Sequence, residues 1–525
     1  MSSKTSPLPE AWQGCQFAPP DHEEASEGQP ASVSELLTYT PELRTDSPAV
    51  WEYPESDDGN AAFFLSHLGH LLRWIPETKL WAVFHKGRWH NDTTGRSQAF
   101  CQYLSRHQLL AADALKKDLA EQIASQVIAS ADALSDSPPL NAKEIKTRVR
   151  MAQKRAQSLG DEKTISSLLQ AASHNGAVIV PAGDWDANPW VIGLRNGILD
   201  LKNQRHRDGR ASDLVTRCMA VDFDSEATCP EWEKFITRIM PDAEVALYLQ
   251  KICGYFLTGS CDDQAFYFFY GDGKNGKSIL VRTLAAVFGT YGAKARHTLV
   301  EENRFGADPK ADLAQLPGVR FLYGEETREG AKLNEAIVKS LVAGDPLTGE
   351  AKYAAPFVFT PEAKLVMMGN HKPKIAGTDT GIWRRVRLIP FTQVITEEEA
   401  IPPTELLARF AAESSGILNW MLEGLALCPP GAIPMPQSIE NAVAEYRQGE
   451  DDLGDFLEEC TQDAAPGYKV KKLEIFQRYQ EWAEENGIRH TLTQKQLTRK
   501  LGERPGWVMD PRRDSWVAKS TRSSP

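Results

Sequence analysis

The stretch that decides the fold is Ala265–Ser278, AFYFFYGDGKNGKS. Residues 265–270 form an unbroken apolar and aromatic run with the length of a buried strand. The sequence Gly-Asp-Gly-Lys-Asn-Gly-Lys-Ser follows at once, and residues 279–288 then have the pattern of a helix. A strand, G-x-x-x-x-G-K-S and a helix in this order predict a loop that binds phosphate groups. A glycine-rich turn with a chance lysine is the alternative interpretation.

Each residue type in this loop has a physical reason. Glycine lets backbone N–H groups turn inward around a phosphate, and the start of a helix adds a favourable dipole. We expect the Lys277 ammonium to neutralise the terminal phosphates and the Ser278 hydroxyl to take a magnesium ion. The predicted nucleotide-binding residues are Gly271, Asp272, Gly273, Lys274, Asn275, Gly276, Lys277 and Ser278.

Two further strands are expected to end in polar side chains. The apolar run that begins at Val319 ends in Glu325 and Glu326, and the run that begins at Lys364 ends in Asn370. A nucleoside triphosphatase needs carboxylates to hold magnesium through water and to polarise the attacking water. An amide is suited to hold that water or to contact the γ-phosphate. A solvated acid pair and an asparagine in an ordinary turn are the alternatives.

Arg384 and Arg385 lie among apolar residues in the stretch 381–390, GIWRRVRLIP. Adjacent arginines are not expected to be buried without partners, so they either form local ion pairs or reach an anion on a neighbouring subunit. An arginine supplied in trans stabilises the charge that phosphoryl transfer develops. The residues alone leave both interpretations open.

The composition bounds the class of protein. The chain has 525 residues, 42% of them apolar and 25% charged, which is typical of a globular protein of about three domains. No apolar window has the length of a membrane span, and no signal peptide or metal-type cysteine spacing is found. We therefore expect reduced cysteines, a cytoplasmic location and no membrane partner. The net charge of −12 hides a basic segment at 467–525, with 13 Lys and Arg against 7 Asp and Glu.

The expected fold class is α/β, because strand and helix patterns alternate through the middle of the chain and imply a mostly parallel sheet. Helices are predicted over 61–72, 98–134, 142–160, 164–172 and 232–257, and a hairpin is predicted to turn at Lys86 and Gly87. The predicted domains are a disordered leader (1–50), a helical domain with a hairpin (51–228), an ATPase domain (229–432), a helical linker (433–466) and a basic C-terminal domain (467–525).

The C-terminal domain has the layout of a winged helix. Helical patterns at 472–486 and 493–501 are followed by strand-like residues near 507 and 516. This layout predicts that a duplex would meet the helix and wing at Arg499, Lys500, Arg512 and Arg513. A basic cap that binds only protein is the alternative.

The order of these motifs resembles the superfamily 3 helicases, and it is most similar to phage and plasmid primase-helicases related to the poxvirus primase-helicase. The resemblance covers about residues 60–510, and it implies an AAA+-like phosphate-loop core. It is carried by the phosphate loop, the Glu-Glu strand, Leu-Asn-Glu-Ala (333–336), Gly-Asp-Pro (344–346), Lys-Tyr-Ala-Ala-Pro (352–356), the strand before Asn370, Trp-Arg-Arg (383–385), and the stretches WAVFHKGRWHNDTTG (81–95) and VIGLRNGILDL (191–201).

The resemblance implies a role for each matching residue in the ATPase domain. It assigns Lys277 and Ser278 to ATP and Mg²⁺, and it places Glu325 and Glu326 on the acidic catalytic strand, with magnesium. Glu326 is favoured as the key glutamate because its spacing to the residues that follow fits better. Asn370 becomes the first sensor.

The resemblance also implies contacts outside the nucleotide site. Arg385, together with Arg384, becomes the finger that points toward the ATP of the adjacent subunit. Lys352 falls at the tip of a hairpin that grips DNA phosphates inside a hexameric ring, and Tyr353 replaces a histidine of the family and is suited to stack on a base or sugar. On sequence alone, a hairpin lysine is a solvated turn residue.

These observations predict an ATP-dependent replicative DNA helicase of a phage, prophage or plasmid. The family implies a homo-hexamer that moves 3′ to 5′ on single-stranded DNA, acts on forked DNA in the bacterial cytoplasm, and works with host or phage replication proteins. The first alternative is an origin-binding initiator or remodelling ATPase without processive unwinding. The second, a small-molecule kinase, fits neither the trans arginine nor the basic C-terminal domain. Residues 1–150 contain no primase motif, so primer synthesis is not expected.

Overall fold

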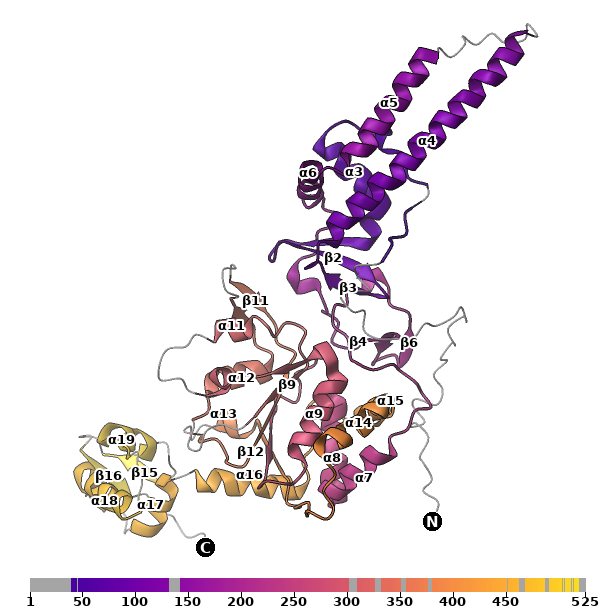
Figure 1. The fold of residues 1–525 in the computed structure, drawn as a ribbon. Helices are drawn as coiled ribbons and strands as arrows, with labels where there is room; N and C mark the ends of the chain where they lie inside the picture. The colour runs from indigo at the N-terminus through magenta and orange to yellow at the C-terminus, as the bar shows by residue number, and fades with distance from the viewer. Residues whose placement is uncertain are drawn as a thin grey trace. The chain divides into compact units, whose positions relative to one another are not determined.

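The computed structural model describes residues 39–44, 46–131, 142–301, 309–325, 332–350, 356–375, 380–450, 452–461, 468–486, 491–502, 504, 506–510, 512 and 514–518 (Figure 1). The chain divides into two compact units. One comprises Met1–Pro373 with Arg384–Ile439, and the other comprises Lys374–Trp383 with Glu440–Pro525. Among the described residues, no helix combines the length and the apolar character needed to cross a membrane.

A parallel sheet of five strands forms the centre of the first unit. Its strand order is β13-β7-β12-β9-β8, and the strands are β7 (Phe266–Tyr270), β8 (Gly292–Lys294), β9 (Phe321–Gly324), β12 (Lys364–Gly369) and β13 (Val386–Pro390). Every residue of β12 is buried, and so are the first four residues of β7. Central strands of a parallel sheet are covered on both faces, which explains their continuous apolar sequence. The predicted mixed α/β fold with a parallel sheet is confirmed.

Helices cover the sheet and share its core. Tyr267 and Phe269 of β7 pack in one cluster with residues of the helices that flank this face. These helices are α7 (Pro230–Ile239), α8 (Ala243–Tyr255), α9 (Lys277–Phe288), α14 (Pro403–Ala412) and α15 (Ser414–Ala426). Shorter elements of the same unit are α10 (His297–Val300), α11 (Lys310–Leu313), α12 (Glu335–Ala343), β10 (Leu347–Gly349) and β11 (Phe357–Phe359).

The single helix predicted over 232–257 is wrong, because the structure has two helices there. α7 ends at Ile239 and α8 begins at Ala243, with Pro241 between them. Proline lacks an N–H group and interrupts the helical ladder. The Asp242 carboxylate then accepts hydrogen bonds from the backbone N–H groups of Glu244 (2.9 Å) and Val245 (3.4 Å), which caps the new helix.

The N-terminal part of this unit combines helices with two small antiparallel sheets (Figure 1). Its hairpin turns at Lys86 and Gly87, as predicted, and both residues have positive φ angles (48° and 73°). Predicted helix 61–72 is shifted, because Ser56 caps a helix that begins at Asp57. The elements are α3 (Asp57–Leu68), α4 (Arg96–Ala131), α5 (Ala142–Ser158), α6 (Glu162–Ala172), β1 (Leu72–Ile75), β2 (Leu80–His85), β3 (Arg88–Asn91), β4 (Val191–Leu194), β5 (Gly197–Asp200) and β6 (Arg205–Arg207).

The second unit has its own core. Leu453 and Phe456 pack with Tyr479, Trp482 and Trp516. Residues that the sequence assigns to a linker ending at 466 therefore contribute to this core. The elements are α13 (Thr380–Trp383), α16 (Gln437–Gly449), α17 (Asp452–Cys460), β14 (Lys469–Lys471), α18 (Lys472–Glu485), α19 (Gln494–Gly502), β15 (Trp507–Met509) and β16 (Ser515–Ala518), with the strands in the antiparallel order β14-β16-β15.

Seven of the eight cysteines lie within the described residues, and all seven are free thiols. Their predicted reduced state is confirmed to that extent. Cys15 lies outside the described residues.

Candidate nucleotide site

The loop between β7 and α9 has a backbone that requires glycine at two positions. Gly271 has a φ of 154°, and a Cβ atom there would lie 2.2 Å from the carbonyl oxygen of Phe391. Gly276 has a φ of 84°, and its Cβ would lie 2.7 Å from the side chain of Ile239. Lys274 also adopts the left-handed region, with a φ of 60°. Turns of this kind direct successive N–H groups to one side, which suits an anion.

Lys277 opens α9 and is buried, with only 6% of its surface exposed. Its ammonium donates hydrogen bonds to the backbone oxygen of Gly271, to Oδ1 of Asn275 (3.0 Å) and to Oδ1 of Asn370 (3.4 Å). These oxygens are neutral. A phosphate chain carries several negative charges, so it would accept hydrogen bonds from such an ammonium more strongly than a neutral oxygen does.

Asn275 fastens the loop to the sheet. Its amide nitrogen donates to the carbonyl oxygens of Asp272 and Phe391, the second at 3.2 Å. Phe391 directly follows β13, so the loop is held at the end of a neighbouring strand. The side chain is 4% exposed, and its position inside the loop indicates a role in shaping the backbone.

Polar residues follow β9 and β12 at the same edge of the sheet. Gly369 of β12 lies opposite Tyr270, and Met367 lies opposite Gly324, so Asn370 and Glu325 follow strand ends that neighbour the loop. Because carboxyl ends of parallel strands share one edge, this register explains how distant motifs come together. Glu326 lies outside the described residues.

Glu325 has a partner that the motifs did not predict. Its carboxylate forms an ion pair with Lys294 (2.9 Å), and both side chains are about half exposed (55% and 54%). Lys294 ends β8, the strand beside β9. The pairing therefore depends on strand order, and no local sequence pattern predicts it. An exposed pair of this kind contributes little stability and opens readily.

A cleft of about 990 Å³ connects these residues. It is lined by loop residues Gly273–Ser278 and also by Glu325 and Asn370, so the structure brings the predicted residues of three strand ends to one cavity. Sequence reasoning missed the other wall, which carries apolar and charged side chains. That wall includes Phe235, Arg238, Ile395, Glu397, Glu399, Ile401, Pro403 and Leu406.

The segment that follows β13 is tied to the loop and to α7. The N–H of Ile395 donates to the carbonyl oxygen of Lys274 (2.7 Å), and the Lys274 ammonium pairs with Glu397 (3.1 Å). Arg238 pairs with Glu399 (2.7 Å) across the same region. The apolar side chains of this wall offer a surface for a flat ring, next to the polar loop.

Arg384 and Arg385 lie at the opposite edge of the sheet. They directly precede β13, whose first residue Val386 is paired with Phe266 at the start of β7, and the N–H of Phe266 donates to the Arg385 carbonyl oxygen (2.8 Å). Strand β7 separates that position from the loop by about 15 Å, at roughly 3.3 Å per residue. Neither arginine lines the cleft. A role at the nucleotide of the same chain is therefore not supported.

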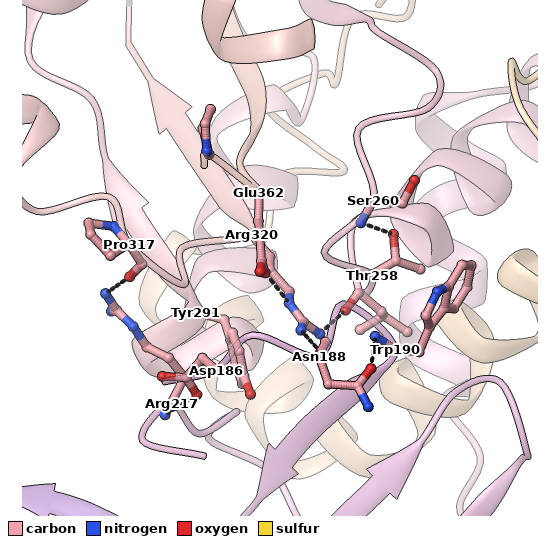
Figure 2. Close-up of polar contacts among 12 residues, drawn as sticks. Asp186, Asn188, Trp190, Arg217, Thr258, Ser260, Tyr291, Pro317, Arg320 and Glu362 are labelled. Carbon is pink, nitrogen blue, oxygen red and sulfur yellow. Dashed lines mark hydrogen bonds and ion pairs between the residues drawn. The ribbon is translucent and has the colours of Figure 1, made fainter. Parts of the chain in front are cut away.

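The amino-terminal edge of the sheet holds buried charges that are paired within the chain. Arg320 is 1% exposed and contacts Glu362 (3.3 Å), the carbonyl oxygens of Leu257 (2.7 Å) and Asn188 (3.1 Å), and the face of the Tyr291 ring (Figure 2). Burial raises the pKa of Glu362, although Arg320 opposes that shift. Burial lowers the pKa of the neighbouring Lys364 to about 7.

The N-terminal sheet elements attach to the five-stranded sheet and its helices at this edge. Arg217 donates to the carbonyl oxygens of Thr290 (2.6 Å) and Pro317, which lie after α9 and before β9, and Asp186 accepts from the N–H of Arg217 at 3.1 Å (Figure 2). The N–H of Gly193 donates to the Tyr291 hydroxyl (3.0 Å). These contacts join the domain that precedes the phosphate loop to the far ends of the loop helix and the acidic strand.

The remaining predicted residues are only partly described. Arg499 and Lys500 lie on α19, and Arg512 lies between β15 and β16, with Arg499 and Arg512 exposed. The strands β10 and β11 form an antiparallel pair on either side of the stretch that contains Lys352 and Tyr353. Lys352, Tyr353 and Arg513 lie outside the described residues.

Comparison with known proteins matches two families. Residues 61–241 match the family described as "D5 N terminal like", and residues 269–385 match a family of unknown function (DUF5906). The protein named "Putative helicase L207/L206" of Acanthamoeba polyphaga mimivirus is 26% identical over 326 residues, 57% of this chain and 34% of its own length. The protein named "Putative helicase 121R" of Invertebrate iridescent virus 3 is 28% identical over 231 residues, 42% of this chain and 24% of its own.

The match thus spans about a third of the length of the first relative and about a quarter of the length of the second. Among solved structures, the apo C-terminal region of NrS-1 matches 85% of this chain and 96% of its own, with a TM-score of 0.44 and 11% sequence identity.

Proposed function

We propose, from the premise that this chain is a member of the D5-like primase-helicase family, that it is an ATP-dependent DNA helicase for replication of a phage, prophage or plasmid. One observation carries the proposal. The loop with buried Lys277 meets Glu325 and Asn370 in a single cleft, although the three follow separate strands. Names of relatives support a role as a replication helicase or primase.

The residues of the cleft fit ATP. Glycine at positions 271 and 276 lets the loop turn while it packs closely against Phe391 and Ile239, and Lys277 supplies a buried positive charge. The apolar wall that includes Phe235 and Leu406 is suited to the base. Asn370, within hydrogen-bonding distance of Lys277, is positioned to sense the terminal phosphate or to hold the attacking water.

Mg²⁺ fits the same edge. The hydroxyl of Ser278 and the carboxylate of Glu325 both face the cleft, and both offer the oxygen ligands that magnesium prefers. The ion would neutralise charge on the phosphates when bound. Glu325, or Glu326 beside it in the sequence, would draw a proton from the attacking water. The Glu325 carboxylate must leave Lys294 to do so. This separation costs little free energy because the ion pair is exposed to solvent.

We further propose a homo-hexameric ring with an AAA+-like core. The strand order, in which β12 separates the loop strand β7 from the acidic strand β9, supports such a core. The position of Arg384 and Arg385 about 15 Å from the loop of their own chain supports a role at a neighbour's nucleotide. In the ring, Lys352 and Tyr353 would grip single-stranded DNA and drive 3′-to-5′ movement, and a winged-helix-like C-terminal domain would bind the duplex through Arg499, Lys500, Arg512 and Arg513.

An origin-binding initiator without processive unwinding is the second candidate, favoured by the exposed basic residues on α19. Measurement of ATP turnover and of strand displacement on a forked duplex separates the two. We expect Lys277→Ala to lower both by at least about 10²-fold, because no neighbouring group replaces a positive charge at the phosphates. Lys339→Ala, which removes the ion pair with Glu335 on α12 and does not touch the cleft, serves as the control.

Turnover of Lys277→Ala within about tenfold of wild type would overturn the phosphate-loop assignment, since a tenfold change is only about 1.4 kcal/mol of barrier. ATP turnover without strand displacement by the wild-type protein would favour the initiator.

A further inference from the structure

Helix α5 is the most basic element of an acidic chain. Over Ala142–Ser158 it carries six Lys and Arg residues and one Glu, a net charge of +5 within a chain of net charge −12. The C-terminal segment 467–525 needs 59 residues to reach +6. Neither the motifs nor the proposed nucleotide site uses α5.

The basic side chains of α5 gather on the face that points away from its partner helix. Helices α4 and α5 run side by side (Figure 1). Val149, Ala152 and Ala156 are buried, whereas Lys146, Arg150 and Lys154 are exposed. The last three follow one another at intervals of four residues, so they form a single row with a rise of about 6 Å per step. We call Lys146, Arg150 and Lys154 the basic stripe.

Within the described residues, no hydrogen bond or ion pair involves the side chains of the basic stripe. Arg155 differs, because it is buried and donates to the carbonyl oxygen of Pro54, and it therefore has a structural role. Like charges four residues apart on a helix repel one another by about 0.2–0.5 kcal/mol per pair. The row is thus an electrostatic cost that the fold does not offset locally.

The helical arm that presents the stripe contributes little to the core. At its base, Phe100 and Leu104 of α4 belong to the cluster that also includes Ala156. Farther out, the buried apolar residues among those described are Ala112, Leu119, Val149 and Ala152, with Leu115 packed against Leu119 and Val149. Two long helices with so small a shared core expose a large surface, which suggests that the arm serves binding more than stability.

The chemistry of the stripe favours a duplex backbone. Val149 of α5 packs against α4, and Met151 is its one large apolar side chain exposed among the described residues, which is too little for the apolar face that a lipid surface needs. The sequence of α5 contains no aromatic residue, and single-strand binding without sequence preference relies on aromatic stacking. A row of long cations about 6 Å apart can meet separate phosphates of one strand, which lie 3.4 Å apart along the axis of a DNA duplex.

We propose that the basic stripe on α5 binds the phosphate backbone of double-stranded DNA. The inference rests on the proposed function only in taking DNA as the substrate, and it adds a contact outside both the nucleotide cleft and the C-terminal domain. Each of the three cations releases counterions when it meets a phosphate, so the stripe contributes affinity that falls steeply with salt.

The test measures binding of the full-length protein to a blunt-ended labelled duplex by fluorescence anisotropy at several salt concentrations. The triple variant Lys146→Gln, Arg150→Gln, Lys154→Gln should reduce the slope of log affinity against log salt by about 2 to 3, at roughly 0.9 per phosphate contact. The matched control removes three exposed cations of α4 through Arg106→Gln, Lys116→Gln and Lys117→Gln. It should change the slope by less than about 1.

A conservative variant separates charge from fold. Lys146→Arg with Lys154→Arg keeps the charges and should keep the wild-type slope, while ATP turnover without DNA should be the same in all of these proteins. An unchanged slope in the triple variant, or an equal fall in the control, would overturn the proposal. The proposal would also be overturned if the triple variant lost affinity only for single-stranded DNA or only for poly-glutamate, because the basic stripe would then bind another partner. Lys277→Ala should bind the duplex like wild type. A failure of the ATPase assignment can therefore be distinguished from a failure of the basic-stripe proposal.

Discussion

The two edges of the five-stranded sheet carry similar residue types with opposite outcomes. At the carboxyl-terminal edge, Lys277, Glu325 and Asn370 surround an open cleft. At the amino-terminal edge, Arg320 and Glu362 are buried against each other and against backbone oxygens of distant segments. A charged side chain is therefore not a functional residue by its type alone. Its role depends on whether the fold encloses it or leaves it on the wall of a cleft.

The physical reason lies in what closes each edge. Residues 186–217 cover the amino-terminal edge and supply acceptors such as the Asn188 carbonyl oxygen and the Asp186 carboxylate (Figure 2). At the other edge, the loop residues Gly273–Ser278 line a cleft of about 990 Å³ that a ligand can enter. The fold encloses the charges of the first edge, whereas those of the second edge line a cleft where a ligand can reach them.

The largest expected effect is on stability at the closed edge. Arg320→Met leaves Glu362 and two backbone carbonyl oxygens without their donor, which should lower the free energy of unfolding by about 3–5 kcal/mol. Urea denaturation of the full-length protein, followed at the transition of the first unit, measures this loss of unfolding free energy. Arg409→Met, which breaks only exposed pairs with Glu231 and Glu405, should cost about 1 kcal/mol or less. Equal losses of unfolding free energy in the two variants would contradict the contrast between the enclosed charge of Arg320 and the exposed charge of Arg409.

A comparable effect on turnover is expected from Arg385, which lies at the closed edge. Arg385→Ala should leave nucleotide binding intact and lower ATP turnover by about 10³-fold, provided that it acts on the ATP of a neighbouring subunit. Mixtures of Arg385→Ala and Lys277→Ala subunits should regain activity, since each supplies what the other lacks. If both variants assemble and no ratio restores turnover, the trans role is refuted.

The smallest expected effect is a pH dependence of stability. The pKa of Lys364 falls from 10.5 in the unfolded chain to about 7 in the fold because of burial, near Arg320, Glu362 and Cys261. Between these values the unfolded chain holds a proton that the folded chain lacks, so stability should rise with pH by up to about 1.4 kcal/mol per unit. Denaturation at pH 7.0 to 8.5 should show that the free energy of unfolding of wild type rises, relative to that of Lys364→Met, as the pH increases. Parallel curves would contradict the assignment.

Local pattern predicted much of the candidate site. The run 265–278 encodes its strand, glycine loop and helix within neighbouring residues, so the sequence alone places Lys277 at the start of α9. The hairpin at Lys86 and Gly87 was predictable for the same reason, because two adjacent residues adopt left-handed φ angles there. The acids and Asn370 were predicted at strand ends, and the register confirms those positions for Glu325 and Asn370.

The sequence by itself determined which segments form strands, loops and helices, because those choices depend on residues within a few positions of one another. Only the tertiary structure decided the strand order, and with it the pairing of Glu325 with Lys294 and the position of Arg385 away from its own loop. It alone also decided that Arg320 is enclosed while the stripe of α5 is exposed. Burial depends on packing between segments more than 100 residues apart, such as Arg320 and Asn188, and no local pattern encodes that contact.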